Sequence, residues 1–226
     1  MKKAMQSESG LTRRKGIVIQ WSPGFAYAIG LLATDGCLYN DGRHLELVSN
    51  DREQVENLKK CLGINNKITR KTSGSGRGQA FRIQFGDVFF YNFLLGIGIT
   101  PRKSKTIGSL LVPKKYFPDF LRGHFDGDGT FYSYYDPRWP NSFMFYTEIA
   151  SASKKHVIWL QDWTTRLLGV GGRITKSKNN SVYRLKYAKG ESLKLLSMLY
   201  YNKAVVCLPR KRRKVEMALK SVGIEL

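Results

Sequence analysis

Alternation of apolar and polar residues runs through several short stretches of the chain and predicts β-strands with one buried face. The clearest case is Phe81-Arg82-Ile83-Gln84-Phe85, in which the apolar side chains point one way and Arg82 and Gln84 the other. The same pattern recurs in residues 44–47, 145–149 and 183–187. Each predicted sheet therefore has an apolar face for helices and a polar face for solvent or a partner.

Start and stop residues divide most of the remaining chain into helices and hairpins. The predicted helices are 51–62, 87–97, 153–168, 190–201 and a last one from Pro209 through Leu219. The predicted hairpins are 37–49, 66–86, 130–151 and 172–187, with Asp41-Gly42 at the first tip and residues 136–141 at the third.

Two further helices look alike. One ends in AIGLLATDG (28–36) and the other in LRGHFDGDG (121–129). Each stretch has a small residue in third place and precedes a predicted strand. Each closes with a glycine, Gly36 or Gly129, where a helix-terminating residue belongs. Both helices therefore carry a carboxylate, Asp35 or Asp128, in the last turn.

A carboxylate at the C-terminal end of a helix is unfavourable, because that end already carries partial negative charge. The small residues offer a reason for it, since they let two helices pack closely. Packed side by side, the helices would bring Asp35 and Asp128 together at their ends. With the backbone carbonyls of Thr34 and Gly127, these carboxylates would form an oxygen-ligand site for divalent cations.

The two halves of the chain repeat one another. Residues 45–49 overlay 147–151, and Pro101-Arg102-Lys103 overlays Pro209-Arg210-Lys211. Such a repeat predicts an α+β protein of two pseudo-symmetric αββαββα halves, packed through the two similar helices. The predicted halves are residues 17–110 and 111–226, with the boundary near 105–115.

The net charge of the chain indicates what kind of partner it binds. The 226 residues carry 38 Lys and Arg against 17 Asp and Glu, a net charge of +21, which implies a polyanion, most simply nucleic acid. A membrane surface is the alternative. However, no basic amphipathic helix dominates, and the longest apolar run, Val88–Ile99, is too short to span a bilayer.

The polar sheet faces suit the major groove of double-stranded DNA, because Arg or Lys can bind guanine, Gln adenine and Glu the amino group of cytosine. The simpler alternative is a solvated face. The residues expected to bind DNA are Arg43, His44, Glu46, Lys71, Arg77, Arg82, Gln84, Arg138, Tyr146, Glu148, Lys176, Lys178, Arg184 and Lys186.

Three scattered cysteines are typical of reduced thiols inside a cell, and three scattered histidines form no zinc motif. Residues 1–16 are basic and lack an apolar segment, so they predict a flexible arm rather than a secretory signal. We therefore expect an intracellular protein, cytoplasmic in a prokaryote and organellar in a eukaryote.

The stretches 28–36 and 121–129 resemble the paired motifs of LAGLIDADG homing endonucleases in their single-chain, two-motif form. The resemblance implies a monomer with internal pseudo-two-fold symmetry, whose antiparallel sheets form a saddle over a long DNA target. It implies hydrolysis of both strands with Mg²⁺, for which Ca²⁺ or Mn²⁺ can substitute in binding, and association with an intron or intein.

By the same resemblance, the last acids of the motifs, Asp35 and Asp128, bind the catalytic metals. The first copy departs from the pattern, because Ala33 stands where the second copy keeps an earlier acid, Asp126. A stretch beginning at Asp126 also resembles a calcium loop, but the positions that this loop requires to be Gly and Glu are Phe131 and Pro137.

The resemblance further implies a lysine near the end of each half that polarises or deprotonates solvent, which the repeat places at Lys103 and Lys211. Lys211 lies in the basic run 210–214, which also resembles a nuclear import signal or a phosphate clamp. Two other functions fit the composition. One is a non-cleaving relative, such as an RNA maturase or a regulator. The other is a basic RNA-associated protein, which would not explain the paired helix ends.

Overall fold

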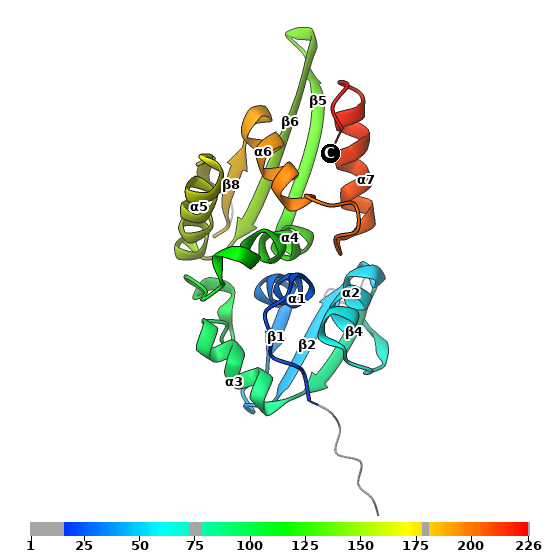
Figure 1. Ribbon diagram of the computed structural model, residues 1–226, viewed down its shortest axis with the longest axis vertical. Helices are drawn as coiled ribbons and strands as arrows, with labels where there is room; N and C mark the ends of the chain where they lie inside the picture. The colour runs from blue at the N-terminus through cyan, green and yellow to red at the C-terminus, as the bar shows by residue number, and fades with distance from the viewer. Residues whose placement is uncertain (1–15, 73–77, 178–180, 226) are drawn as a thin grey trace, which may run out of the picture.

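The computed structural model describes residues 16–72, 78–177 and 181–225. The chain forms two halves, each with a four-stranded antiparallel sheet and helices packed on it (Figure 1). The strand orders are β1-β2-β4-β3 and β5-β6-β8-β7, so the two halves share one topology. The predicted α+β architecture with repeated αββαββα halves is confirmed, and one additional helix, α7, closes the second half.

The first half comprises α1 (Pro23–Thr34), β1 (Gly36–Leu38), β2 (His44–Ser49), α2 (Arg52–Leu62), β3 (Ile68–Thr72), β4 (Gln79–Gly86), α3 (Val88–Ile97) and the 3₁₀ turn η1 (Lys103–Lys105). The second half comprises the 3₁₀ turn η2 (Lys114–Tyr116), α4 (Phe117–Asp128), β5 (Gly129–Asp136), β6 (Trp139–Ser151), α5 (Lys154–Leu168), β7 (Arg173–Lys176), β8 (Tyr183–Tyr187), α6 (Lys189–Leu199) and α7 (Pro209–Lys220).

Local residues set several helix ends. The Ser22 hydroxyl accepts a hydrogen bond from the Phe25 N–H (3.1 Å) at the start of α1, and Asp87 accepts one from the Phe90 N–H (2.9 Å) at the start of α3. Helix α2 ends at Gly63, whose φ of 63° lies in the left-handed region that glycine adopts easily.

The central strands of each sheet align apolar side chains on one face. Leu47 is opposite Ile83 in the first sheet, and Ile149 is opposite Leu185 in the second. All four residues are fully buried in the core beneath the helices. The predicted alternation is therefore confirmed, and the polar residues between them form the opposite faces of the sheets.

Gly36 and Gly129 end the motif helices for a different reason from the one predicted. Neither has a positive φ; Gly36 begins β1, and Gly129 is extended with a φ of −88°. A Cβ on Gly36 would lie 2.6 Å from the Leu32 carbonyl oxygen, and one on Gly129 would lie 2.2 Å from the Phe125 ring. Glycine is required here because each strand starts against its own helix.

The β5–β6 hairpin is tighter at its tip than predicted. Strand β6 begins at Trp139, which leaves only Pro137 and Arg138 between the strands. This hairpin projects beyond the rest of the second half (Figure 1), whereas β1 has only 3 residues.

Residues 107–113 contain no helix or strand and lead from η1 to η2. The domain boundary near residues 105–115 stays a prediction. Within the described ranges, no helix has the length and apolar character needed to cross a membrane. Cys37, Cys61 and Cys207 are all free thiols.

Candidate active site

The motif helices α1 and α4 lie against each other at the centre of the molecule (Figure 1). A Cβ on Gly30 would lie 2.1 Å from the backbone oxygen of Phe120, and one on Gly123 would lie 2.1 Å from that of Tyr27. Each glycine thus touches the backbone of the other helix, in two contacts related by the internal repeat. The predicted close packing is confirmed, because only a residue without a side chain permits these distances.

Asp35 and Asp128 stand at the ends of these helices, near enough for their charges to interact. Burial raises the pKa of Asp35, and a hydrogen bond from Gln54 opposes that rise. Burial, and then the charge of Asp35, raise the pKa of Asp128 to about 6. The Asp128 side chain also reaches solvent, so water moderates this shift. A bound cation would relieve the repulsion between the two carboxylates.

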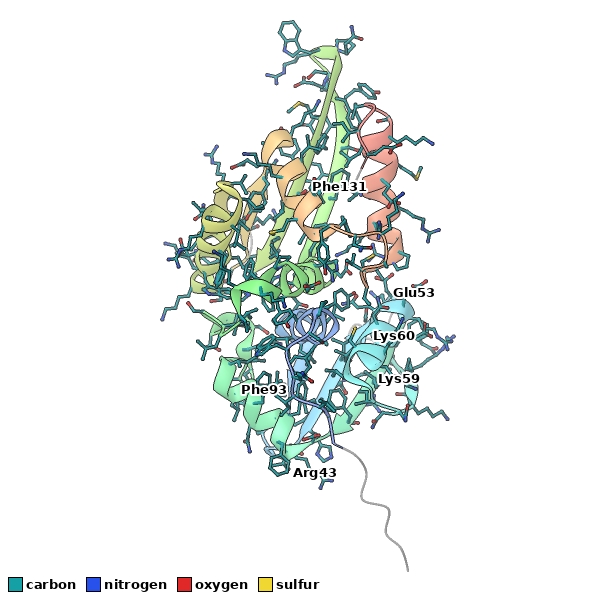
Figure 2. All side chains as sticks on the ribbon, in the orientation of Figure 1. Arg43, Glu53, Lys59, Lys60, Phe93 and Phe131 are labelled. Carbon is teal, nitrogen blue, oxygen red and sulfur yellow. The ribbon has the colours of Figure 1, made fainter. Side chains whose placement is uncertain are left out.

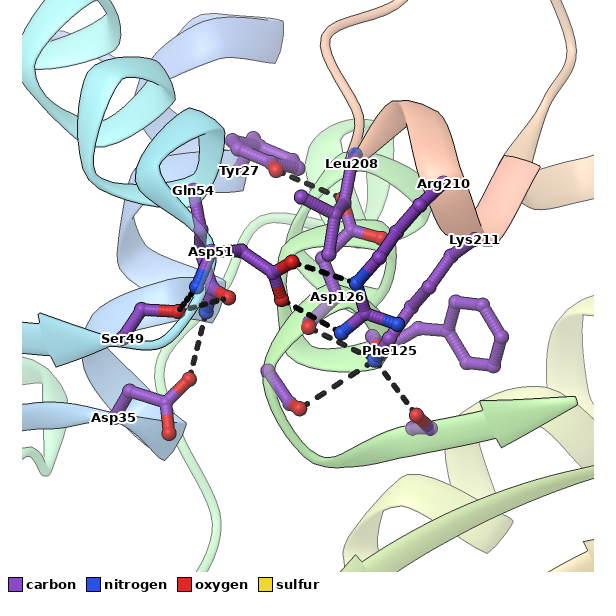
Figure 3. A network of polar contacts seen from close by, with 12 residues as sticks. Tyr27, Asp35, Ser49, Asp51, Gln54, Phe125, Asp126, Leu208, Arg210 and Lys211 are labelled. Carbon is purple, nitrogen blue, oxygen red and sulfur yellow. Dashed lines mark hydrogen bonds and ion pairs between the residues drawn. The ribbon is translucent and has the colours of Figure 1, made fainter. Parts of the chain in front are cut away.

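Lys211 binds the end of α4. Its Nζ donates to the backbone oxygens of Phe125 (2.7 Å), Asp126 (2.8 Å) and Gly129 (2.6 Å), and the Gly127 oxygen lies at 3.5 Å. Figure 3 shows the ammonium group enclosed by this turn. Its positive charge offsets the negative helix end, which makes the position of Asp128 less unfavourable.

Lys103 makes the equivalent contact at the end of α1, where its Nζ donates to the backbone oxygens of Thr34 (3.2 Å) and Gly36. Burial lowers the pKa of Lys103, and it lowers the pKa of Lys211 to about 8. The structure therefore brings each predicted lysine to its motif helix, with its N–H groups directed at backbone oxygens.

Four oxygen groups at the helix ends could hold a divalent cation, namely the carboxylates of Asp35 and Asp128 and the carbonyls of Thr34 and Gly127. Both carbonyls accept from lysine, which leaves each a second lone pair. Over the ranges described, no three His, Cys, Asp or Glu side chains gather as a metal site. One or two carboxylates suit Mg²⁺, which keeps several waters and binds substrate phosphates.

Gln54, at the start of α2, belongs to the site although the sequence does not single it out. Its Nε2 donates to Oδ2 of Asp35 (2.7 Å), and its Oε1 accepts from the Ser49 hydroxyl (2.9 Å), which fixes the amide orientation (Figure 3). Only 2% of Gln54 is exposed. The available signal was an amide side chain on the apolar side of the predicted helix 51–62.

The second half lacks this arrangement. The internal repeat places His156 where the first half has Gln54, and His156 bonds instead to the buried His124, with 3.0 Å between the two Nε2 atoms. Among the described residues, no hydrogen-bond donor holds the carboxylate of Asp128. The two ends of the site are therefore chemically different despite their shared topology.

An ion pair crosses between the halves beside the site. Arg210 donates to Asp51 through Nε (2.7 Å) and Nη2 (2.6 Å) (Figure 3). It borders a cleft of about 570 Å³ beside Asp35. Other residues lining this cleft include Ser49, Gln54, Lys71, Asp126 and Gly127.

Asp126, the acid that the first motif lacks, is buried at 1% exposure. Its Oδ2 accepts from the Tyr27 hydroxyl (2.8 Å) and the Leu208 N–H (2.6 Å). Burial raises the pKa of Asp126 to about 6. These contacts tie α4 to α1 and to the segment before α7, which is a structural role.

The strand pairing places most of the expected DNA-binding residues on the polar faces of the sheets. These are His44, Glu46, Lys71, Arg82, Gln84, Tyr146, Glu148, Arg184 and Lys186. Arg138 lies in the β5–β6 turn and pairs with Asp136 (3.0 Å). Arg43 lies at the end of the first half remote from α4 (Figure 2). Arg77 and Lys178 lie outside the described residues.

Two of these residues differ from expectation. Lys176 is opposite Tyr183, whose side chain belongs to the apolar face, so Lys176 projects to the wrong side and Arg173, opposite Lys186, takes the polar face instead. The Glu46 side chain was expected to be exposed, but only 5% of it is, because Lys71 covers it at 2.6 Å.

Comparison with solved structures finds the same fold in other proteins. The homing endonuclease I-WcaI bound to its DNA recognition sequence matches with a TM-score of 0.61 at 11% identity, over 86% of each chain. I-SmaMI bound to uncleaved DNA in the presence of calcium ions matches with a TM-score of 0.58 at 12% identity, over 90% of this chain and 92% of that one.

Full-length DUF199/WhiA from Thermatoga maritima matches with a TM-score of 0.57 at 14% identity, over 92% of this chain and 63% of that longer one. No protein-family model and no curated protein matches the chain. The shared topology and the pair of motif helices give this chain the LAGLIDADG fold found in homing endonucleases and in the N-terminal domain of WhiA.

Proposed function

We propose that this protein is a site-specific, metal-dependent DNA endonuclease of the homing type, which hydrolyses both strands of a long duplex target. The observation that supports this most directly is the convergence of Asp35 and Asp128 at the ends of two packed helices, each end bound by a lysine. A structural domain alone has no need to hold two carboxylates close enough for the charge of one to raise the pKa of the other.

Binding of double-stranded DNA is supported by the net charge of +21 and by two polar sheet faces in one chain. The solved structures of I-WcaI and I-SmaMI, which share the fold, contain DNA. Because one chain supplies both sheets and both carboxylates, we propose that it acts as a monomer, which light scattering of the free protein and of its DNA complex would test.

The donor set fits Mg²⁺, which when bound would supply an activated water and charge stabilisation at the phosphate. Asp35 and Asp128 would hold the cation, and Gln54 would keep the Asp35 carboxylate in one orientation. This orientation matters because misplacement of a catalytic group by about 1 Å can cost about 100-fold in rate.

The lysines are better suited to positioning than to proton transfer. Lys211 has three N–H donors and four backbone oxygens within 3.5 Å, so it has no donor left for solvent. Among the described residues, Lys103 has two such contacts, which leaves one N–H for a phosphate or a water. We propose that both hold the helix ends and their carbonyls in place.

Asp35→Asn and Asp128→Asn test the proposal, because they keep the side-chain shape and remove the charge that would hold a cation. Both variants should fold, and binding measured with Ca²⁺ should persist. Double-strand cleavage with Mg²⁺ of a target selected from a randomised DNA pool should fall by orders of magnitude.

Asp162→Asn, an exposed change in α5, is the matched control and should cleave normally. Normal cleavage by both motif variants would overturn the assignment of the site. A parent protein that binds selected DNA but cleaves none of it would favour the alternative function, a non-cleaving nucleic-acid-binding protein such as a maturase or regulator.

A further inference from the structure

Each polar sheet face carries a glutamate bonded to a tyrosine hydroxyl. Tyr39 donates to Oε2 of Glu46 (3.0 Å), and Tyr132 donates to Oε1 of Glu148 (2.9 Å). Each tyrosine is the fourth residue after its motif aspartate. The register places Glu46 opposite Cys37 and Glu148 opposite Thr130, which are equivalent positions of the repeat. The same pair therefore stands at the same place in both halves.

A carboxylate is unfavourable on a sheet face that approaches DNA, because its negative charge repels the DNA phosphates. Neighbouring positions of the two sheets differ in residue type. Gln84 is opposite Glu46 in the first sheet, whereas Lys186 is opposite Glu148 in the second. The tyrosine–glutamate pair is present in both halves in spite of this cost.

Each glutamate also holds a basic side chain. In the first half, Lys71 Nζ lies 2.6 Å from Oε1 of Glu46, and Arg82 Nη1 lies 3.6 Å from Oε2. In the second half, Lys186 Nζ lies 3.8 Å from Oε1 of Glu148 and 3.9 Å from the centre of the Tyr146 ring. The basic groups themselves remain partly exposed, at 44% for Lys71 and 36% for Lys186.

We propose that the Tyr39–Glu46 and Tyr132–Glu148 pairs are positioning devices, which hold Lys71, Arg82 and Lys186 so that they discriminate between bases. This inference rests on the proposed DNA binding of the sheets. A free lysine reaches many phosphates and bases through its rotamers, whereas a lysine held before binding loses less entropy in one geometry. The pairs therefore increase specificity and reduce overall affinity.

This role differs from the direct reading of cytosine that the sequence predicts for Glu46. Both of its carboxylate oxygens already face donors, from Lys71 and from Tyr39, and 5% of the side chain is exposed. A base edge cannot reach an acceptor that these side chains cover. Its function on this face is therefore exerted through its partners.

The test compares binding of the parent and of Glu46→Gln to the sequence selected from a randomised duplex pool and to an unrelated duplex, with Ca²⁺ present. Glu46→Gln should bind the unrelated duplex about two- to threefold more tightly, because one repulsive charge is lost. Its preference for the selected sequence should fall about tenfold, spread over several positions of one half-site. Glu148→Gln should do the same in the other half-site.

Tyr39→Phe removes a positioning contact without changing charge, and it should lower the preference while leaving binding to the unrelated duplex unchanged. Glu56→Gln, in an exposed ion pair with Arg52 on α2, removes the same charge elsewhere and should leave the preference unchanged.

Three outcomes would overturn the inference. They are an unchanged preference in both glutamate variants, a loss confined to a single cytosine, and an equal loss of affinity for every sequence. The second would indicate direct reading and the third a purely structural role. A parent protein that binds no duplex would instead refute the proposed function, so the two failures are distinguishable.

Discussion

Replacing Gly123 by Ala tests whether the contact between α1 and α4 positions the two carboxylates. The new Cβ would lie 2.1 Å from the backbone oxygen of Tyr27, whereas ordinary contact begins at 3.4 Å. The helices would have to separate by about 1 Å, because the obstructing atom belongs to the backbone of a buried helix and cannot rotate away.

The free-energy effect has two opposing parts. Alanine favours a helix over glycine by about 1 kcal/mol, and overpacking a close contact costs about 1–3 kcal/mol or more. Since the shortfall in distance is large and falls on backbone, we expect Gly123→Ala to lower the free energy of unfolding by about 1–3 kcal/mol. A shift of about 1 Å between the helix ends should also reduce cleavage by about 100-fold.

Denaturant titration and cleavage of the selected target measure the two effects. Gly96→Ala is the matched control, because it lies inside α3 with no atom within 4 Å of the added Cβ and should raise stability by up to about 1 kcal/mol. If Gly123→Ala unfolded at the same denaturant concentration as the parent and cleaved at the same rate, the role assigned to this contact would be wrong.

Three further predictions follow from charge and burial. If about six to ten phosphates are neutralised, a plot of log affinity against log salt concentration should have a slope of roughly −5 to −9, and a nearly flat titration would contradict this. Arg82→Ala or Arg184→Ala should cost about 1–3 kcal/mol at one or two base pairs of its own half-site, and an equal loss on all sequences would indicate phosphate contact instead. Burial lowers the pKa of His124 well below its usual value and that of His156 to about 4. The stability that this neutral pair contributes is therefore fully present above about pH 6.5 and is lost as the pH falls toward 4. The melting temperature of the parent should exceed that of His156→Gln at pH 7, and this difference should shrink as the pH is lowered to about 5.

Several features of the fold and the site were determined by the sequence alone. Strand alternation such as that of Leu47 and Ile83, and the helix end at Gly63, depend on neighbouring residues, so they can be read from short windows. The internal repeat then indicated which segments are equivalent. The glycine in third place of each motif predicted the close helix contact, because the requirement for a missing side chain is visible in the sequence.

The tertiary structure decided which polar groups meet in space. Gln54 reaches Asp35 from another helix, and Arg210 pairs with Asp51 from the other half of the chain. These contacts depend on how helices pack across long separations in sequence, which no local pattern specifies. For the same reason, the sequence did not predict that Lys103 and Lys211 donate to backbone oxygens at the ends of the motif helices.

The structure was also needed to show how exposed each side chain on the polar sheet faces is. Alternation correctly assigned Glu46 to the polar face, yet that face is not uniformly exposed, because Lys71 from a neighbouring strand covers the carboxylate. Lys176 was expected to bind DNA, but it follows the apolar Ile174 by two residues, so strand alternation places both side chains on the apolar face, opposite Tyr183 and Leu185. Sequence periodicity sets which side chains share a face, whereas packing and register set which of them can meet a partner.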